Sequence, residues 1–176
     1  MPELPEVETV RKGLEDRLFG FQIDQIEVCR SRSIASPGGP QEFIEMMKGA
    51  IIGKWSRRGK YLISNLHQAN LASKKSPDYL IHCGFLGVHL RMTGQFHWLE
   101  QVKPPCPYTR VRFLNKQKQE LRFVDVRNFG QLWWVPPDKY PEEIIKGLSK
   151  LGPEPFSTEF NSDYLENRLK GKKRTI

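Results

Sequence analysis

The first residues of the chain carry groups that could act as a nucleophile and as an acid or base. If Met1 is removed, Pro2 becomes the terminal residue and its nitrogen becomes a free secondary amine. An α-amino group has an ordinary pKa of about 7.7–8, so much of it is unprotonated near neutral pH. Such an amine attacks carbonyl carbons and forms Schiff bases. Glu3 stands beside it and is a candidate acid or base.

The same stretch also has the composition of a helix start. Pro5 suits the first helical turn, where its missing N–H is not needed. Glu6 and Glu8 suit the positive end of a helix dipole. Judged on these residues alone, an ordinary helix start is the more common explanation, and both interpretations stay open.

A helical periodicity follows and predicts the element that would hold this terminus in place. Apolar residues recur at three- and four-residue steps, with charged residues on the other face. The apolar positions are Leu4, Val7, Val10, Leu14 and Leu18. We expect an amphipathic helix that ends near Phe19-Gly20 and anchors the N-terminus against a core.

The rest of the chain is rich in short strand patterns separated by turn signals. Strands are expected at 21–28, 50–55, 61–66, 79–90, 108–113, 121–125 and 131–135. Short helices are expected around 43–47, 141–151 and 161–169, and residues 67–78 are predicted to form a polar surface insertion. Many short strands of this kind argue for a β-sandwich or a barrel.

The composition favours a nucleic-acid partner. The 176 residues hold 28 Lys and Arg against 20 Asp and Glu, a net charge of +8, which suits a polyanion. Cys29, Cys83 and Cys106 form no C-x-x-C pair, and the four histidines have no metal spacing. Without a signal peptide or a long apolar span, we expect a cytoplasmic, nucleoid-associated protein with no membrane partner.

Five segments, in this order, resemble the formamidopyrimidine-DNA glycosylase family. They are Pro2–Thr9, Arg58–Leu62, Leu90–Gly94, Asp125–Gly130 and Leu151–Pro155. The resemblance implies an α+β fold, in which a β-sandwich flanked by helices is followed by the start of a helical second domain.

The family's domain organisation can be placed on the chain. It implies a catalytic β-sandwich domain at 1–136, a linker and helix at 137–155, and the start of a helix-two-turns-helix DNA-binding domain at 156–176. The remainder of that domain and the family's zinc finger would lie beyond Ile176. We therefore expect no cofactor and no metal in this chain, which we expect to be a monomer.

The resemblance implies excision of oxidised purines, such as 8-oxoguanine and formamidopyrimidines, from damaged double-stranded DNA, followed by strand cleavage at the abasic (AP) site. By resemblance, Pro2 is the nucleophile, Glu3 a proton donor near the sugar, and Lys60 a proton donor or phosphate contact during elimination. Considered alone, Lys60 would be an ordinary solvated lysine.

Further residues correspond to the family's DNA contacts. Met92, Arg127 and Phe129 resemble the residues that fill the hole left by a flipped base, although apolar side chains of this kind are more often part of a core. Lys173 matches a lysine that meets phosphate, and Tyr108 stands where a phosphate-contacting His is common. Asn128 departs from the Arg that many relatives carry.

Two other functions remain open at this stage. The chain could be a non-catalytic or weakly active DNA-binding remnant of the same family, since much of the second domain would lie beyond its last residue. It could also be an unrelated RNA- or single-strand-binding barrel. The sequence lacks the run of exposed aromatic residues that such a barrel needs, and a barrel does not explain the N-terminus.

Overall fold

The computed structural model describes residues 1–70 and 80–172. The helices are α1 (Leu4–Leu18), α2 (Gly39–Met47), α3 (Pro141–Ile144) and α4 (Ser162–Leu169), with a short 3₁₀ turn, η1, at Ser31–Ser33. The strands are β1 (Gln25–Val28), β2 (Ile51–Arg58), β3 (Tyr61–Ala69), β4 (Leu80–His89), β5 (Gly94–Leu99), β6 (Thr109–Leu114), β7 (Glu120–Asp125) and β8 (Gln131–Val135).

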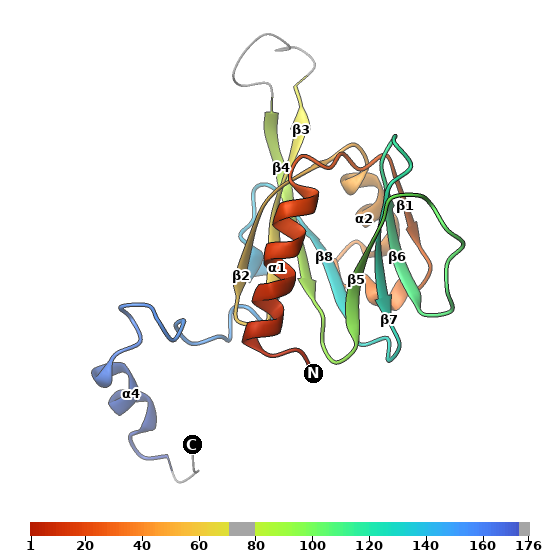
Figure 1. Cartoon of the computed structure of the whole chain (residues 1–176). Helices are drawn as coiled ribbons and strands as arrows, with labels where there is room; N and C mark the ends of the chain where they lie inside the picture. The colour runs from red at the N-terminus through yellow and green to blue at the C-terminus, as the bar shows by residue number, and fades with distance from the viewer. Residues whose placement is uncertain (71–79, 173–176) are drawn as a thin grey trace.

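The strands form two four-stranded antiparallel sheets, in the orders β1-β6-β7-β5 and β2-β3-β4-β8. They face one another as a sandwich, with α1 running along the front and α2 on the opposite side (Figure 1). The predicted α+β sandwich flanked by helices is therefore confirmed. Strand β5 had no counterpart in the sequence-based prediction, and residues 67–69 of the predicted polar insertion extend β3 instead. Residues 71–79 of that insertion lie outside the described part of the chain.

Helix α1 is held by a narrow apolar stripe. Val7, Leu14 and Leu18 are buried in the core between the sheets, as the sequence periodicity predicts. Burying a side chain of this size stabilises the fold by about 1.5–3 kcal/mol. The chain leaves the helix through Gly20, whose φ of +82° favours glycine. Because α1 begins at Leu4, the first three residues of the chain are held by this helix at one end of the sandwich (Figure 1).

The C-terminal part of the chain first covers the outer face of the second sheet. Ile145 and Leu148 are buried there against Tyr61 and Trp133. The helix predicted for 141–151 is wrong beyond Ile144, because the backbone turns with i to i+3 hydrogen bonds. A Cβ atom at Gly147 would lie 1.8 Å from the Tyr61 hydroxyl oxygen, so the close packing on the sheet needs glycine at this point.

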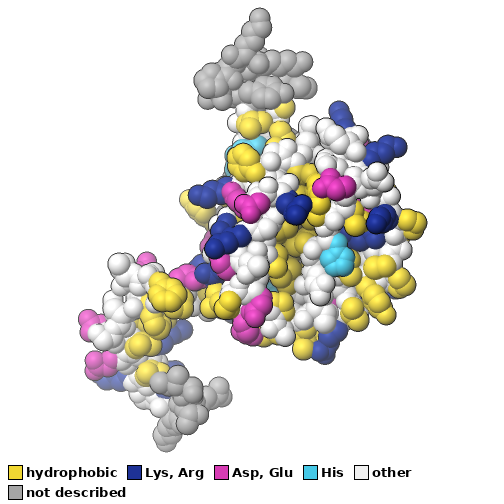
Figure 2. Space-filling view, in the orientation of Figure 1, with side chains coloured by type: hydrophobic (Ala, Val, Ile, Leu, Met, Phe, Trp, Pro, Cys, Tyr) yellow, Lys and Arg dark blue, Asp and Glu magenta, His cyan; other side chains and the backbone are white. Residues whose placement is uncertain are grey.

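Helix α4 stands apart from the sandwich in this view (Figures 1 and 2). Asn161 caps it by accepting a 2.9 Å hydrogen bond from the Tyr164 N–H. None of its residues is buried.

The division of the chain at 136 and 155 stays a prediction. None of the helices among residues 1–70 and 80–172 is long and apolar enough to cross a membrane.

Candidate active site at one end of the sandwich

The N-terminus meets three strand connections at one end of the molecule. The turn between β2 and β3 carries Lys60, whose Nζ lies 2.5 Å from Glu3 Oε2. A pocket of about 400 Å³ lies between the N-terminus, the β4–β5 turn and the β7–β8 loop. Its lining residues are Met1, Arg32, Arg91, Met92, Asn128, Phe129 and Gln131. The fold thus brings together most of the residues that the sequence singled out.

The geometry of the N-terminal stretch is that of a helix start, and the role of Pro2 as a nucleophile stays a prediction. Glu3 is the N-cap of α1, and its N–H donates to Glu6 Oε2 at 3.0 Å. Pro2 is half-buried and directly precedes this cap. The predicted helix start is therefore confirmed, and it places the Pro2 nitrogen beside the pocket that Met1 lines.

A row of polar contacts attaches α1 to the edge of β2. Arg57 Nε donates to Glu8 Oε2 at 3.2 Å, and the Trp55 N–H donates to Glu15 Oε2 at 2.5 Å. Burial alone would raise the pKa of the Glu8 carboxyl, but hydrogen bonds and charges from Arg11 and Arg57 outweigh it and lower the pKa. Such partly exposed pairs stabilise by only about 0–1 kcal/mol, so their effect is to fix the helix against the strand.

Asp125 joins the two loops that border the pocket. It is fully buried at the end of β7. Its carboxylate accepts hydrogen bonds from the Thr93 hydroxyl in the β4–β5 turn, from the Arg127 N–H at 3.2 Å and from the Gly130 N–H at 2.7 Å. The sequence comparison placed Asp125 inside a family-like segment but gave it no role. Its contacts make it the residue that holds both loops in register.

The two loops also carry strained backbone. Arg91 and Asn128 have φ angles of +57° and +56°, in the left-handed region that few residues other than glycine adopt. Each directly adjoins a predicted DNA-contacting residue, Met92 or Phe129. Backbone of this kind persists where surrounding contacts hold it, and it occurs often at functional sites.

His89 contacts the turn that contains Arg91. Its Nδ1 accepts a 3.0 Å hydrogen bond from the Arg91 N–H, and its ring packs edge-on against Tyr61. Burial, and then the positive charges of Arg91 and Lys60, lower the pKa of His89 to about 4. The ring is therefore neutral at physiological pH, as an Nδ1 acceptor requires.

The predicted wedge residues are exposed at the rim of the pocket. Met92 is 40% exposed and Phe129 is 43% exposed, so neither is part of the core. The guanidinium of Arg127 lies over the Phe129 ring, 5.1 Å from its centroid. Tyr108 is exposed but does not line this pocket, and its carbonyl accepts from the Asp125 N–H. Lys173 lies outside the described residues.

Much of the positive charge is used inside the chain. Arg112 and Arg122 both pair with Glu120, which is fully buried, and Arg112 also pairs with Glu27. Their guanidinium groups also donate to the carbonyl of Lys103. The count of 28 Lys and Arg residues therefore overstates how many cations are free for a polyanion, although the net charge of +8 is unaffected by these pairs. Figure 2 shows acidic and basic side chains intermingled over α1 and its surroundings.

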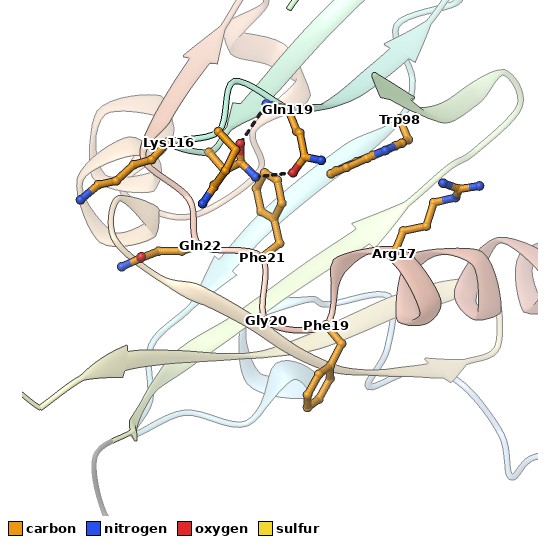
Figure 3. A pocket seen from close by; sticks show the side chains of 10 residues that line it. Arg17, Phe19, Gly20, Phe21, Gln22, Trp98, Lys116 and Gln119 are labelled. Atoms are coloured by element: carbon orange, nitrogen blue, oxygen red, sulfur yellow. Dashed lines mark hydrogen bonds between the residues drawn. The ribbon is translucent and has the colours of Figure 1, made fainter. Parts of the chain in front are cut away.

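A second pocket, of about 530 Å³, lies beside the C-terminal end of α1 (Figure 3). It is lined by Arg17, Phe19, Gly20, Phe21, Gln22, Trp98, Asn115, Lys116, Gln117 and Gln119. None of the predicted site residues is among them. The indole of Trp98 and the amide of Gln119 already donate to Glu100.

Among residues 1–70 and 80–172, no three His, Cys, Asp or Glu side chains are grouped to hold a metal ion.

Comparison with known proteins identifies the family. Residues 1–132 match the model of the formamidopyrimidine-DNA glycosylase N-terminal domain. The chain is 62% identical over 180 residues to the formamidopyrimidine-DNA glycosylase of Prochlorococcus marinus strain MIT 9313. It is 54% identical over 176 residues to the enzyme of that name from Parasynechococcus marenigrum strain WH8102. Both alignments cover 100% of this chain, which spans 60% and 59% of those relatives' lengths.

Solved structures give the same result. The chain is similar to Lactococcus lactis formamidopyrimidine-DNA glycosylase bound non-covalently to DNA containing an AP site, with a TM-score of 0.81 and 30% identity. That match covers 99% of this chain and 60% of the other. A complex of the same enzyme with DNA containing FAPY-dG matches with a TM-score of 0.77 and 30% identity, over 96% of this chain and 57% of the other. The chain belongs to the formamidopyrimidine-DNA glycosylase family.

Loss of the Asp125 carboxylate should loosen both loops and destabilise the fold. Asp125→Ala leaves the buried Gly130 N–H without its partner, and we expect the free energy of unfolding to fall by about 2–4 kcal/mol. Urea denaturation measures the change. Asp138→Ala, at an exposed aspartate after β8, is the control and should change it by less than about 0.5 kcal/mol. Equal effects of the two substitutions would contradict the role given to Asp125.

Neutral His89 should make stability depend on pH. Between the ordinary pKa of 6.5 and the folded value of about 4, the unfolded state binds more protons, so stability is lost as the pH falls through this window. From pH 7 to pH 5 we expect wild type to lose about 2 kcal/mol more than His89→Asn, whose side-chain oxygen can still accept from Arg91. Denaturation curves at the two pH values measure this difference. Parallel losses in the two proteins would rule out the neutral His89.

Proposed function

We propose that this chain carries the catalytic half of a base-excision-repair DNA glycosylase and AP lyase that acts on oxidised purines in double-stranded DNA. The observation that carries the proposal is the Glu3–Lys60 ion pair next to Pro2, which directly follows Met1, a lining residue of the pocket between two wedge-bearing loops. The named relatives are formamidopyrimidine-DNA glycosylases, and two of the matched structures hold DNA with an AP site or with FAPY-dG.

The proposed nucleophile is the Pro2 nitrogen after removal of Met1. Its lone pair forms a bond to the sugar C1′, while the electron pair of the glycosidic bond leaves with the damaged base, which takes up a proton. The nitrogen then gives up its proton, and breaking of the bond between C1′ and the ring oxygen, which takes up a proton, gives an iminium ion between Pro2 and C1′. This cation is an electron sink, so loss of a C2′ proton expels the 3′-phosphate, and a second elimination expels the 5′-phosphate.

Glu3 and Lys60 are the proposed acid–base pair. The short distance between their charged groups lets a proton pass from one to the other without a large movement. Glu3 adjoins Pro2 and would donate to the opening sugar ring. Lys60 would donate a proton or hold a phosphate during the eliminations.

The loops at the pocket would stabilise the opened duplex. Extruding a base costs a few kcal/mol of stacking and pairing, and the gap must be filled. Met92 and Phe129 are apolar and exposed, so they can enter between base steps. Arg127 can hydrogen-bond the edge of the orphaned base. Tyr108 and Lys173 are proposed phosphate contacts.

Borohydride trapping tests the nucleophile. Incubation with an 8-oxoguanine duplex and borohydride should give a covalent protein–DNA band with wild type. Glu3→Gln removes the proposed acid, and Pro2→Gly replaces the ring-held secondary amine by a mobile primary amine, so both should reduce the yield at least about tenfold. The matched control is Pro5→Ala, which changes an exposed proline of the same segment and should retain the band.

Two results would contradict the proposal. An adduct that maps to a residue other than the terminal residue 2 would place the nucleophile elsewhere. Salt-sensitive DNA binding without any adduct or strand cleavage would favour the alternative, a DNA-binding remnant of the same family.

Phe129 should matter for opening the duplex more than for holding it. With 2-aminopurine opposite or beside the lesion, binding of wild type should raise its fluorescence as the base unstacks. Phe129→Ala should lose most of this rise even at saturating protein, while affinity falls by about 5- to 150-fold, because one stacking contact contributes about 1–3 kcal/mol. Phe156→Ala, which changes a fully exposed phenylalanine, is the control. An unchanged fluorescence rise in Phe129→Ala would exclude the wedge role.

A further inference from the structure

Glu154 makes contacts that the proposed chemistry does not account for. Its Oε1 accepts hydrogen bonds from the Gly59 N–H at 2.7 Å and from Arg58 Nη1 at 2.9 Å. Its Oε2 accepts from both terminal nitrogens of Arg57 at 3.3 Å. One carboxylate therefore meets three consecutive residues, the last two of β2 and the first of the β2–β3 turn, and the next residue along is Lys60.

The residues before Glu154 reinforce this contact. Arg58 Nη2 donates to the Gly152 carbonyl at 2.5 Å. Leu151 lies over Gly59, so that a Cβ at position 59 would come within 2.9 Å of its Cδ1. Gly59 also has a φ of +55°, which favours glycine. Segment 151–154 thus lies against a turn whose backbone conformation favours glycine at position 59.

Arg57 links this contact to the N-terminal helix. Its Nε donates to Glu8 on α1, while its terminal nitrogens donate to Glu154. The turn is therefore held between α1 on one side and segment 151–154 on the other. Burial alone would raise the pKa of the Glu154 carboxyl, but the Gly59 N–H, Arg58 and Arg57 outweigh it and lower the pKa. Glu154 is therefore ionised throughout the neutral range.

We propose that Glu154 is a positioning residue, which fixes the β2–β3 turn and thereby sets the place of the Lys60 ammonium beside Glu3. For its effect on catalysis this inference rests on the proposed function. Glu154 does not reach the substrate in this role, since it lies on the turn rather than in the pocket. Because segment 151–154 leads on to α4, the site is completed by residues that follow the sandwich in the sequence.

A double-mutant cycle tests whether Glu154 acts through Lys60. The variants are Glu154→Ala, Glu154→Gln, Lys60→Ala and the double variant Lys60→Ala with Glu154→Ala. Glu159→Gln is the matched control, because no hydrogen bond or ion pair within the described chain involves this exposed glutamate. Cleavage of a duplex with a preformed AP site is measured at saturating protein, together with the dissociation constant for DNA and the melting temperature.

We expect Glu154→Ala to slow cleavage by about tenfold to a hundredfold, the range expected when a catalytic group is displaced by about 1 Å. The dissociation constant for DNA should change by less than about twofold, because Glu154 has no contact role there. Glu154→Gln keeps an acceptor for the Gly59 N–H and should restore part of the rate. In the Lys60→Ala background, Glu154→Ala should cause no further loss.

A rate loss that multiplies with that of Lys60→Ala would overturn the inference, because it would show that Glu154 acts independently of Lys60. The inference would also be overturned if the loss of cleavage rate merely followed the fall in melting temperature and Glu154→Gln restored none of the rate.

A measurement that needs no activity separates this inference from the proposed function. In amide NMR spectra of the folded chain, the Gly59 proton should titrate with the Glu154 carboxyl, and it should not titrate in Glu154→Gln. The Gly59 and Lys60 amide signals should both move in Glu154→Ala, whereas Glu159→Gln leaves them in place. Unchanged Gly59 and Lys60 signals would overturn the inference even in an active protein. A wild type that forms no adduct, with these shifts present, would count against the proposed function and not against the positioning of Lys60.

Discussion

The attachment of α1 to the edge of β2 is the constraint on which the candidate site depends. Buried Val7, Leu14 and Leu18 supply most of the free energy that holds the helix, whereas its charged residues supply the register. The contact between Glu8 and Arg57 sets how far along the strand the helix lies. A shift of one helical turn, about 5.4 Å, would separate Glu3 from Lys60 and move Pro2 away from the pocket.

Two acidic side chains, the buried Asp125 and the partly exposed Glu154, organise the other parts of this end of the sandwich. Asp125 ties the β4–β5 turn to the β7–β8 loop, and Glu154 ties the β2–β3 turn to the chain that follows the sheets. The exposed residues proposed to meet DNA adjoin backbone that these carboxylates hold in unusual conformations. The residues proposed to bind DNA are exposed, and other residues, the two carboxylates, keep their loops rigid. This division lets a site on surface loops keep its geometry.

The sequence predicted what depends on local pattern. Periodicity located α1 and the hairpin that carries Lys60, and the family-like segments indicated the terminus and the wedges. It missed what depends on distant partners. Glu154 meets Gly59 across 95 positions, and Gly147 packs closely against the hydroxyl group of the distant Tyr61. Strand β5 went unpredicted because it follows the Arg91 turn directly, without a separating loop. Net charge could not show that Arg112 and Arg122 are used by Glu120.

We propose that the terminal amine of Pro2 is the reacting group and that the fold presents it to the DNA. Peptide mapping by tandem mass spectrometry, after reduction of the chain with AP-site DNA, tests this most directly because it locates the bond. The account predicts a nucleotide remnant on the nitrogen of Pro2, in a peptide that has lost Met1. A remnant on Lys60 or another lysine, or a modified protein that still carries Met1, would contradict it.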